Sequence, residues 1–257
     1  MSTAKLKVES WWDEETKVDS PNLEPEVPKK SYSNRLVAWI DILGMRNMIK
    51  DESNEADTIF GVMEKLRSFV QTPCASLAKE GKVHYTQIAD GFMIVADIEC
   101  ANDFCSLLAD VQWRVLVECQ MLLRGAVTAG KVSVSDDPQI IIGPAYVDAY
   151  MLESENAIYP RVILTDEFFS ATKGHLNFPY IATDADKERY LDFLPYAIQK
   201  NNLDPKRVEH LLETQGVFKV LKDTIKKANK AKSSGRSVSQ KHGWTVSKLE
   251  MHKIKVR

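Results

Sequence analysis

Apolar and polar residues are arranged along the chain in a pattern that predicts a central sheet with helices. Residues 36–43, LVAWIDIL, are apolar except for Asp41, and Gly44 ends the run, which is typical of a buried strand. Two β-prone runs flank Ala89-Asp90-Gly91, so we predict a hairpin with Asp90 at its turn. A carboxylate inside a buried strand needs a metal ion or a basic partner, and two such aspartates on adjacent strands suggest a two-metal site.

The helical spacing of apolar residues predicts helices at residues 55–71, 101–119 and 145–155, with Thr72-Pro73 interrupting the first. Gly44 opens a further apolar segment. Residues 121–134 are interpreted as a strand pair or one bent strand, and shorter strands are expected at 140–144 and 159–164. The resulting order, β-α-α-β-β-α-β-β-α-β, predicts an α+β fold with one central, mostly antiparallel sheet flanked by helices.

The C-terminal part is expected to be a helical extension. Asp204-Pro205 predicts a capped helix start, a further helix should run to about residue 231, and Ser233–Gly235 should break it. Trp244 is expected to anchor the last segment. Asp184-Ala-Asp186 is suggestive of a calcium loop, but the rest of that motif is missing and a turn is favoured.

Three parts are expected along the chain. Residues 1–33 form an acidic, proline-containing arm in which Trp11-Trp12 could dock on the domain or on a partner subunit. Residues 34–170 form the main domain. Residues 171–257 form the extension, whose basic helices pack on the domain or on a dimer partner.

Composition narrows the function classes. With 257 residues, 44% of them hydrophobic, and a net charge of -2, the chain can bury a full core and is not a dedicated nucleic-acid binder. No apolar run is long enough to cross a bilayer and no signal-peptide core is seen, so a cytoplasmic protein without a membrane partner is expected. The four cysteines show no zinc spacing and are interpreted as reduced packing thiols.

Charge is unevenly distributed. Residues 205–257 hold 14 Lys and Arg against 4 Asp and Glu, so the remainder is acidic. A nucleic-acid or membrane surface is one interpretation. Packing of the basic tail on the acidic body is favoured, because no aromatic residues or nucleic-acid motif accompany the charge.

Four stretches in order resemble the motifs of class III nucleotidyl cyclases. The strand ending in Asp41-Ile-Leu-Gly44 is similar to their first metal motif, and the Asp90 hairpin, 49 positions later, to the second. Leu123–Gly130 resembles the Arg-x-Gly-x-x-x-Gly strand, and Gly143–Tyr150 the start of the last core helix. The match covers roughly residues 36–165.

This resemblance implies a two-metal reaction that makes a 3′,5′-cyclic nucleotide. Two divalent cations, Mn²⁺ or Mg²⁺, would be held by Asp41, Asp90 and the carbonyl of Ile42. Backbone N–H groups of the turn Ile42-Leu43-Gly44-Met45-Arg46 would bind phosphates. Arg124 corresponds to the arginine at the pyrophosphate end, and Lys131 is a second candidate. The alternative is that both aspartates are structural turn residues.

The sequence departs from purine cyclases where the base is read. Thr86 stands at the position of the base-reading Lys, and Ile140 or Ile141 at that of the base-reading Asp. A site without these polar partners should not select adenine. Asp148 stands at the position of the transition-state Asn, and Leu152 where an Arg is usual. Either the enzyme is inactive or it reads another base.

The chain further resembles the pyrimidine cyclases of bacterial Pycsar antiphage systems. The strand containing Arg124-Gly125, the helix Gly143–Glu153 and the following Tyr159-Pro-Arg161 carry this likeness. It implies UTP or CTP as substrate, with UTP slightly favoured because Thr86 and Gln87 are neutral. It also implies a head-to-tail homodimer with sites at the interface, and a separate effector activated by the cyclic product.

Three functions remain open. The first is a pyrimidine cyclase, in which Trp39 contacts the base or lies in the core. The second is a purine cyclase with unusual base contacts. The third is a catalytically inactive, cyclase-like signalling module, for which the missing Asn and Arg argue.

Overall fold

The structure, a computed structural model, describes residues 31–51, 53–78, 82–136, 139–231 and 236–256. Most of the predicted N-terminal arm with Trp11-Trp12, and the predicted helix break at Ser233–Gly235, lie outside these ranges. The strands are β1 (Ser33–Leu43), β2 (Val83–Ile88), β3 (Gly91–Ala96), β4 (Leu122–Asp136), β5 (Gln139–Ile142), β6 (Val162–Leu164), β7 (Ile181–Thr183) and β8 (Arg189–Leu191).

The helices follow the predicted order between the strands. They are α1 (Met45–Lys50), α2 (Ala56–Ala78), a short 3₁₀ helix (Ile98–Cys100), α3 (Ala101–Cys119), α4 (Pro144–Glu155), α5 (Asp166–Ala171), α6 (Phe193–Lys200), α7 (Pro205–Thr214), α8 (Val217–Lys230) and α9 (Arg236–Met251). The interpretation of residues 121–134 as one bent strand is confirmed, because β4 is continuous.

One eight-stranded sheet organises the molecule. Its strands run in the order β2-β3-β1-β4-β6-β8-β7, and β5 pairs with the far end of β4. All pairs are antiparallel except β4 with β6. The mostly antiparallel α+β architecture expected from the sequence is therefore confirmed. Strand β1 lies between β3 and β4, and it pairs with β4 over its whole length and with β3 from Leu36 to Ile40.

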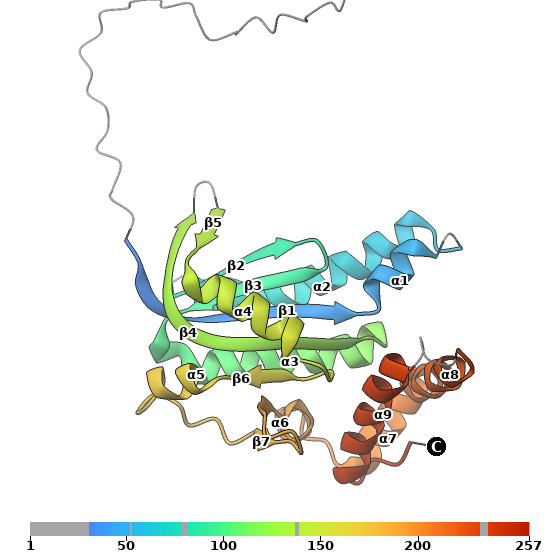
Figure 1. Ribbon diagram of the computed structural model, residues 1–257. Coiled ribbons are helices and arrows are strands. Elements are labelled where there is room, and N and C mark those ends of the chain that lie inside the picture. The colour runs from blue at the N-terminus through green and yellow to red at the C-terminus, as the bar shows by residue number, and fades with distance from the viewer. Residues whose placement is uncertain (1–30, 52, 79–81, 137–138, 232–235, 257) are drawn as a thin grey trace, which may run out of the picture.

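Helices cover both faces of the sheet (Figure 1). Successive side chains of a strand point to opposite faces, so Ile40 and Ile42 belong to one face and Trp39 and Asp41 to the other. The first face packs on α2 and α3 and forms the larger core. The second face packs on α4 in a smaller cluster. Asp41 therefore lies on the α4 side.

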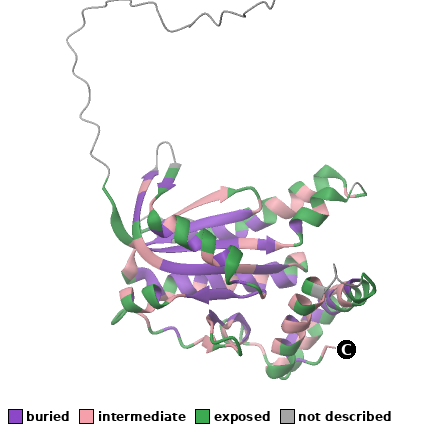
Figure 2. Ribbon diagram, in the orientation of Figure 1, coloured by how far each residue is buried: buried purple, intermediate pink, exposed green. Residues whose placement is uncertain are grey.

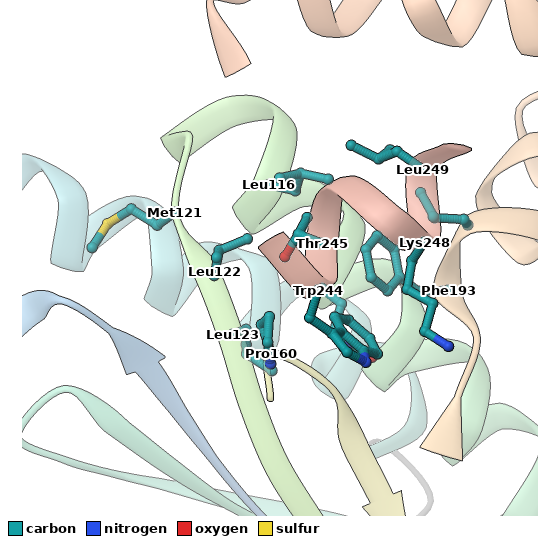
Figure 3. Close-up of a pocket in the computed structure, with 12 residues that line it drawn as sticks. Leu116, Met121, Leu122, Leu123, Pro160, Phe193, Trp244, Thr245, Lys248 and Leu249 are labelled. Atoms are coloured by element: carbon teal, nitrogen blue, oxygen red, sulfur yellow. The ribbon is translucent and has the colours of Figure 1, made fainter. Parts of the chain in front are cut away.

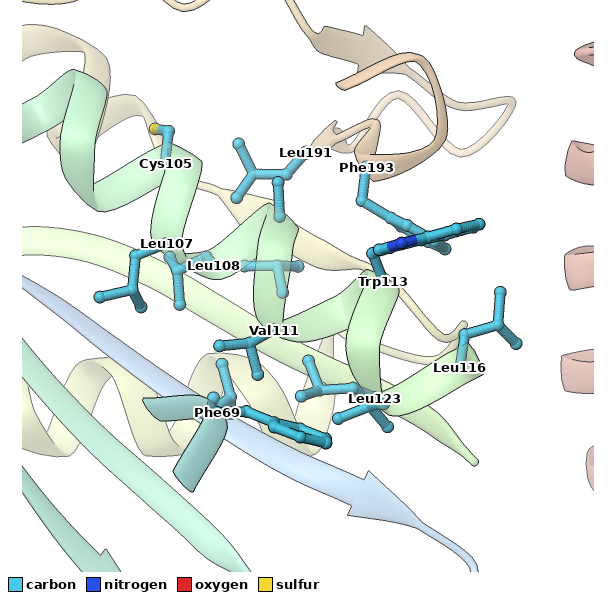
Figure 4. Close-up of a cluster of buried hydrophobic side chains, with 14 of the residues drawn as sticks. Phe69, Cys105, Leu107, Leu108, Val111, Trp113, Leu116, Leu123, Leu191 and Phe193 are labelled. Atoms are coloured by element: carbon cyan, nitrogen blue, oxygen red, sulfur yellow. The ribbon is translucent and has the colours of Figure 1, made fainter. Parts of the chain in front are cut away.

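Helix α3 forms the centre of the larger core (Figure 4). Leu108, Val111 and Leu116 of this helix pack with Phe69 of α2 and with Leu123 of β4. Buried residues follow the sheet and its inward helix faces, and exposed residues follow the outer faces (Figure 2). Each buried side chain of this size contributes roughly 1.5–3 kcal/mol by leaving water.

The prediction that Thr72-Pro73 interrupts the helix is wrong, because α2 continues through Pro73 to Ala78. Proline costs about 3 kcal/mol in a helix interior, since it removes one backbone hydrogen bond and clashes with the preceding turn. Phe69 and Val70 before the proline and Cys74 after it are all buried in the core. Their tertiary packing offsets the local penalty.

The C-terminal helices α7, α8 and α9 gather at the end of the sheet where β1 ends (Figure 1). As predicted, Asp204 caps α7, and its carboxylate accepts a hydrogen bond of 2.9 Å from the backbone N–H of Arg207. No helix in the described ranges is long and apolar enough to cross a bilayer.

Trp244 anchors α9 as predicted, and a buried ionic cluster explains how. Asp184 Oδ2 accepts hydrogen bonds of 2.6 Å from the Trp244 indole N–H and from the Arg161 guanidinium, while Lys248 Nζ lies 3.2 Å from Asp184 Oδ1. The turn predicted at Asp184–Asp186 is confirmed, and both carboxylates bind Arg161, which is 0% exposed.

Candidate active site

Strand pairing brings Asp41 and Arg124 together. They are register partners on the antiparallel strands β1 and β4, and Arg124 Nη2 lies 3.5 Å from Asp41 Oδ2. The hairpin between β2 and β3 contributes Asp90 in its turn, directly before Gly91. Since β3 pairs with β1 as far as Phe92 and Ile40, this turn lies beside the end of β1 that carries Asp41.

A third carboxylate, Glu153 of α4, completes this group. Glu153 Oε1 forms an ion pair with Arg124 Nε, and its side chain is only 4% exposed. Arg124 thus lies between two carboxylates, one on β1 and one on α4. We name Asp41, Asp90, Arg124 and Glu153 the charged cluster.

Burial and repulsion between negative charges raise the pKa values of Asp41 and Glu153. The pKa of Asp41 is raised first by burial and next by the negative charge of Asp90, against the opposing effect of Arg124. The pKa of Glu153 is raised to about 7, mainly by burial, with Asp41 and Asp90 adding to it and Arg124 opposing. A cation bound beside Asp41 and Glu153 would therefore be stabilised.

Helix α9 adds a second positive charge from the C-terminal extension. Burial and the nearby charge of Arg124 lower the pKa of Lys241, while Glu153 and Asp41 oppose this shift. Lys241 in turn lowers the pKa of Glu153. Lys241 is therefore an electrostatic neighbour of the charged cluster.

The residues present fit divalent cations. A cation between Asp41 and Asp90 would relieve the repulsion that raises the pKa of Asp41, and the Ile42 carbonyl is a hard oxygen donor close by in the chain. Among the described residues, no group of three or more His, Cys, Asp or Glu is arranged as a metal site. Mg²⁺ commonly uses one or two carboxylates together with substrate phosphates.

Trp39 lies in the small core under α4 and beside the hairpin turn. It is 7% exposed, and its ring meets Tyr150 edge-on with 5.4 Å between centroids. A Cβ atom on Gly91 would lie 2.5 Å from Trp39 Cζ2, so only glycine permits this approach. Thr86 pairs with Met93, which pairs with Trp39, so these three residues belong to one sheet face.

The turn after β1 has the conformation expected of a helix start. Gly44 precedes α1 with φ +96°, a left-handed conformation that glycine adopts readily. The backbone N–H of Ile42 hydrogen-bonds the Asp41 carboxylate. The side chains of Ile42 and Leu43 belong to the larger core, so only their backbone groups are available to a ligand.

Other predicted site residues lie elsewhere in the chain. Lys131 is exposed, seven positions along β4 from Arg124 and on the opposite sheet face, about 23 Å away at 3.3 Å per residue. Ile140 and Ile141 lie on β5, at the opposite end of β4 (Figure 1). Asp148 is exposed on α4. Within one chain Lys131, Ile140 and Ile141 therefore lie far from Asp41.

Glu153 and Lys241 were not predicted as site residues. Glu153 follows Ala145 and Ala149 at intervals of four on the buried face of α4. A carboxylate on a buried helix stripe is a signal that could have identified it. Lys241 is one of many basic residues in the C-terminal part, and its sequence neighbourhood contains no comparable signal.

A scan of family models finds no match to the chain. No curated protein sequence matches it either. Among solved structures, a bacterial light-regulated adenylyl cyclase is similar with a TM-score of 0.50 and 13% identity, over 66% of this chain and 55% of that one. The monomeric guanylyl cyclase domain of the RhoGC fusion protein from the aquatic fungus Blastocladiella emersonii gives a TM-score of 0.46 and 16% identity, over 63% of this chain and 95% of that one.

The match therefore spans about half the length of the light-regulated cyclase. At this identity the likeness concerns the fold. The central sheet flanked by helices is that of class III cyclase catalytic domains, which confirms the expected fold class.

Proposed function

We propose that this protein is a nucleotidyl cyclase that converts a pyrimidine nucleoside triphosphate, UTP or CTP, to its 3′,5′-cyclic monophosphate and pyrophosphate. The observation that carries the proposal is the convergence of Asp41, Asp90 and Arg124 at one end of the sheet. Three residues from separate motifs meet there, and the fold matches that of class III cyclase catalytic domains.

The residues suit separate tasks in this reaction. Arg124 would bind the triphosphate at its pyrophosphate end, where a planar guanidinium can hold two oxygens. The 3′-oxygen bonds to the α-phosphorus while the bond to the bridging oxygen breaks, and pyrophosphate leaves with those electrons. The hydroxyl proton passes to solvent. The backbone N–H groups of the turn from Ile42 to Arg46 are candidates to bind phosphate oxygens.

Asp41, Asp90 and the Ile42 carbonyl would hold the divalent ions, Mn²⁺ or Mg²⁺. When bound, such ions lower the pKa of the ribose hydroxyl and neutralise the triphosphate. The raised pKa of Asp41 supports this assignment, because the site disfavours a second uncompensated negative charge.

The choice of a pyrimidine rests on the base-reading positions. Thr86 lies on the same sheet face as Trp39, where purine cyclases carry a lysine. Ile140 is 46% exposed and Ile141 is buried, so neither offers a carboxylate to adenine. UTP is favoured over CTP because Thr86 and Gln87 are neutral and can donate to a carbonyl.

A head-to-tail homodimer is part of the proposal. Ile140 on β5 is about 36 Å along β4 from Arg124, at 3.3 Å per residue, so it can meet a substrate only in another subunit. Asp148 is exposed on α4 and so is accessible to a second subunit. The resemblance to antiphage cyclases adds the proposal that the product activates a separate effector during infection.

The test is incubation of the purified protein with ATP, GTP, CTP and UTP separately in Mn²⁺, with products separated by chromatography. A cyclic pyrimidine product from one triphosphate is expected. A cyclic purine product would favour the purine alternative. No product from any of the four would favour the inactive signalling module.

Variants of the charged cluster distinguish catalysis from binding. Asp41→Ala and Asp90→Ala should each lose turnover by at least about 10³-fold while keeping the fold, because both carboxylates are needed for the ions. Arg124→Ala should mainly weaken triphosphate binding. These are measured as initial rates and as triphosphate affinity by calorimetry. A fully active Asp90→Ala protein would remove the metal-site assignment.

A further inference from the structure

Helix α9 presents one face to the catalytic sheet. Trp244 packs on a third group of buried residues, which are Ala126, Ala157, Ile163 and Tyr190. Lys248 of the same helix bonds to Asp184. Lys241 precedes Trp244 by three positions and Lys248 by seven, so the three share this face. Ala126 is two residues after Arg124, on the same face of β4. Lys241 therefore projects from the docked face of α9 toward the end of β4 that carries Arg124.

Helix α9 is held against the sheet by buried side chains and a ring contact. Thr245 and Leu249 of α9 line a cavity of about 20 Å³ with Leu116 of α3 and Leu122 of β4 (Figure 3). Thr245 and Leu249 are both buried. The Trp244 ring stacks on the Tyr159 ring with 6.0 Å between their centroids. A helix held in this way keeps the position of Lys241 relative to the sheet.

The charges around Lys241 suit an anionic ligand with several oxygens. Arg124 and Lys241 are two cations with Glu153 as a shared counter-charge, and Asp41 lies on the other side of Arg124. Two neighbouring cations in a partly buried position repel each other unless an anion lies between them. Glu153 is the protein's own anion there, and a phosphate chain would be a stronger one.

We propose that Lys241 of the C-terminal extension is a substrate-binding residue, which holds the β- and γ-phosphates of the nucleoside triphosphate together with Arg124. This rests on the proposed nucleotidyl cyclase function of the same site. Helix α4 has Leu152 where purine cyclases carry an arginine, and Lys241 supplies a positive charge from another element of the same chain. The extension is thereby part of the active site rather than only a support for it.

Pyrophosphate binding, measured by titration calorimetry in Mg²⁺, tests this without requiring turnover. Lys241→Gln should weaken the affinity roughly tenfold, the effect of losing one hydrogen bond to a charged group. Lys241→Arg should restore most of it. The matched control is Lys226→Gln, which removes an exposed lysine of α8 in the same extension and should change nothing. Thermal unfolding of each variant checks that α9 remains docked.

A second measurement uses the wild-type protein. Acetylation of lysines by acetic anhydride, followed by mass spectrometry, should show Lys241 protected by pyrophosphate and Lys226 unprotected. Steady-state kinetics of Lys241→Gln should show a raised KM with a smaller change in kcat. Unchanged affinity in Lys241→Gln, or no protection of Lys241, would overturn the inference.

The two proposals fail in different ways. A wild-type protein that binds pyrophosphate but forms no cyclic nucleotide contradicts the proposed function, and the Lys241 variants still decide the role of this residue. A wild-type protein that binds no pyrophosphate overturns the role of Lys241. An equal loss of pyrophosphate affinity in Lys241→Arg and Lys241→Gln also overturns the role of Lys241, because that role depends on its positive charge.

Discussion

Three charged residues, Asp41, Arg124 and Glu153, lie where burial makes a charge energetically costly. Asp41 and Glu153 both lie on the α4 side of the sheet, and Arg124 contacts each of them. An ion pair in such a position is a weak source of stability, because desolvation opposes the attraction. The proposed binding of ions and triphosphate is therefore a better explanation of the charged cluster than a contribution to folding.

Glu153 should make stability depend on pH. Its folded pKa is about 7, above the ordinary value of 4.5, so the folded protein binds a proton that the unfolded chain releases between these values. The contribution is fully present below about pH 4.5 and is lost as pH rises through 7. The loss should be on the order of 1–3 kcal/mol.

Urea unfolding at pH 5 and pH 8 measures this effect. Glu153→Gln should flatten the difference between the two pH values relative to wild type. The matched control is Glu155→Gln, which removes an exposed carboxylate two positions later on the same helix. The same pH dependence in wild type and Glu153→Gln would contradict the assignment.

Gly91 should tolerate no side chain. A Cβ atom there meets Trp39 Cζ2 at 2.5 Å and the Ile40 carbonyl oxygen at 3.2 Å, so Gly91→Ala must displace the indole or the strand. We expect a loss of about 1–3 kcal/mol in unfolding free energy. The control is Gly61→Ala in α2, where no atom lies within 4 Å and alanine should stabilise by up to about 1 kcal/mol. Equal effects of the two substitutions in thermal unfolding would refute the packing argument.

At the scale of elements, the docking of α9 depends on Asp184 more than on any surface ion pair. Although burial opposes it, hydrogen bonds from Trp244 and Lys248 hold the pKa of Asp184 below its ordinary value. The fully buried Arg161 bonds to the same carboxylate. A turn between β7 and β8 thus joins the sheet to the last helix.

Asp184→Ala should loosen α9, because it removes one of the two carboxylates that bind Arg161 among the described residues, and it removes the acceptor of Trp244. Breaking a buried pair from one side typically costs about 3–5 kcal/mol. Hydrogen exchange of α9 amides should become faster. In the matched control, Asp166→Ala, the pair with Arg189 is lost from a side chain that is 91% exposed, so less than about 1 kcal/mol is expected. Unchanged exchange in Asp184→Ala would contradict this role.

At the scale of the whole molecule, the described residues expose an apolar surface beside the small core. Val147, Tyr150 and Met151 lie at helical spacing on α4, and Ile140 and Ile142 alternate on β5, which ends just before that helix. Large exposed apolar side chains gathered on adjacent elements are typical of an interface. This surface suits the proposed homodimer.

Val147→Glu combined with Met151→Glu should convert the dimer to a monomer in size-exclusion chromatography with light scattering, because two charges would be buried without partners. In the proposed homodimer the sites combine residues of both subunits, so the proposed formation of cyclic nucleotide should fall with dimerisation. The control is Phe60→Glu, which places a charge at a position of α2 that is already 66% exposed. A double variant that remains dimeric would exclude this surface as the interface.

The sequence by itself determined the order of elements through β6 and the positions of Asp41, Asp90 and Arg124. Strand and helix periods are local properties, and glycines and turns mark element ends, so each is readable over a few residues. The four motifs in order predicted the fold class, which the structure confirms. The roles of the site residues stay predictions.

Only the tertiary structure decided which distant residues share one environment. Helix α2 passes through Pro73 because Phe69 and Cys74 are buried on either side of it. Glu153 and Lys241 approach Arg124 because α4 and α9 dock on the same end of the sheet. Such proximity depends on packing between segments far apart in the chain, and no local pattern records it.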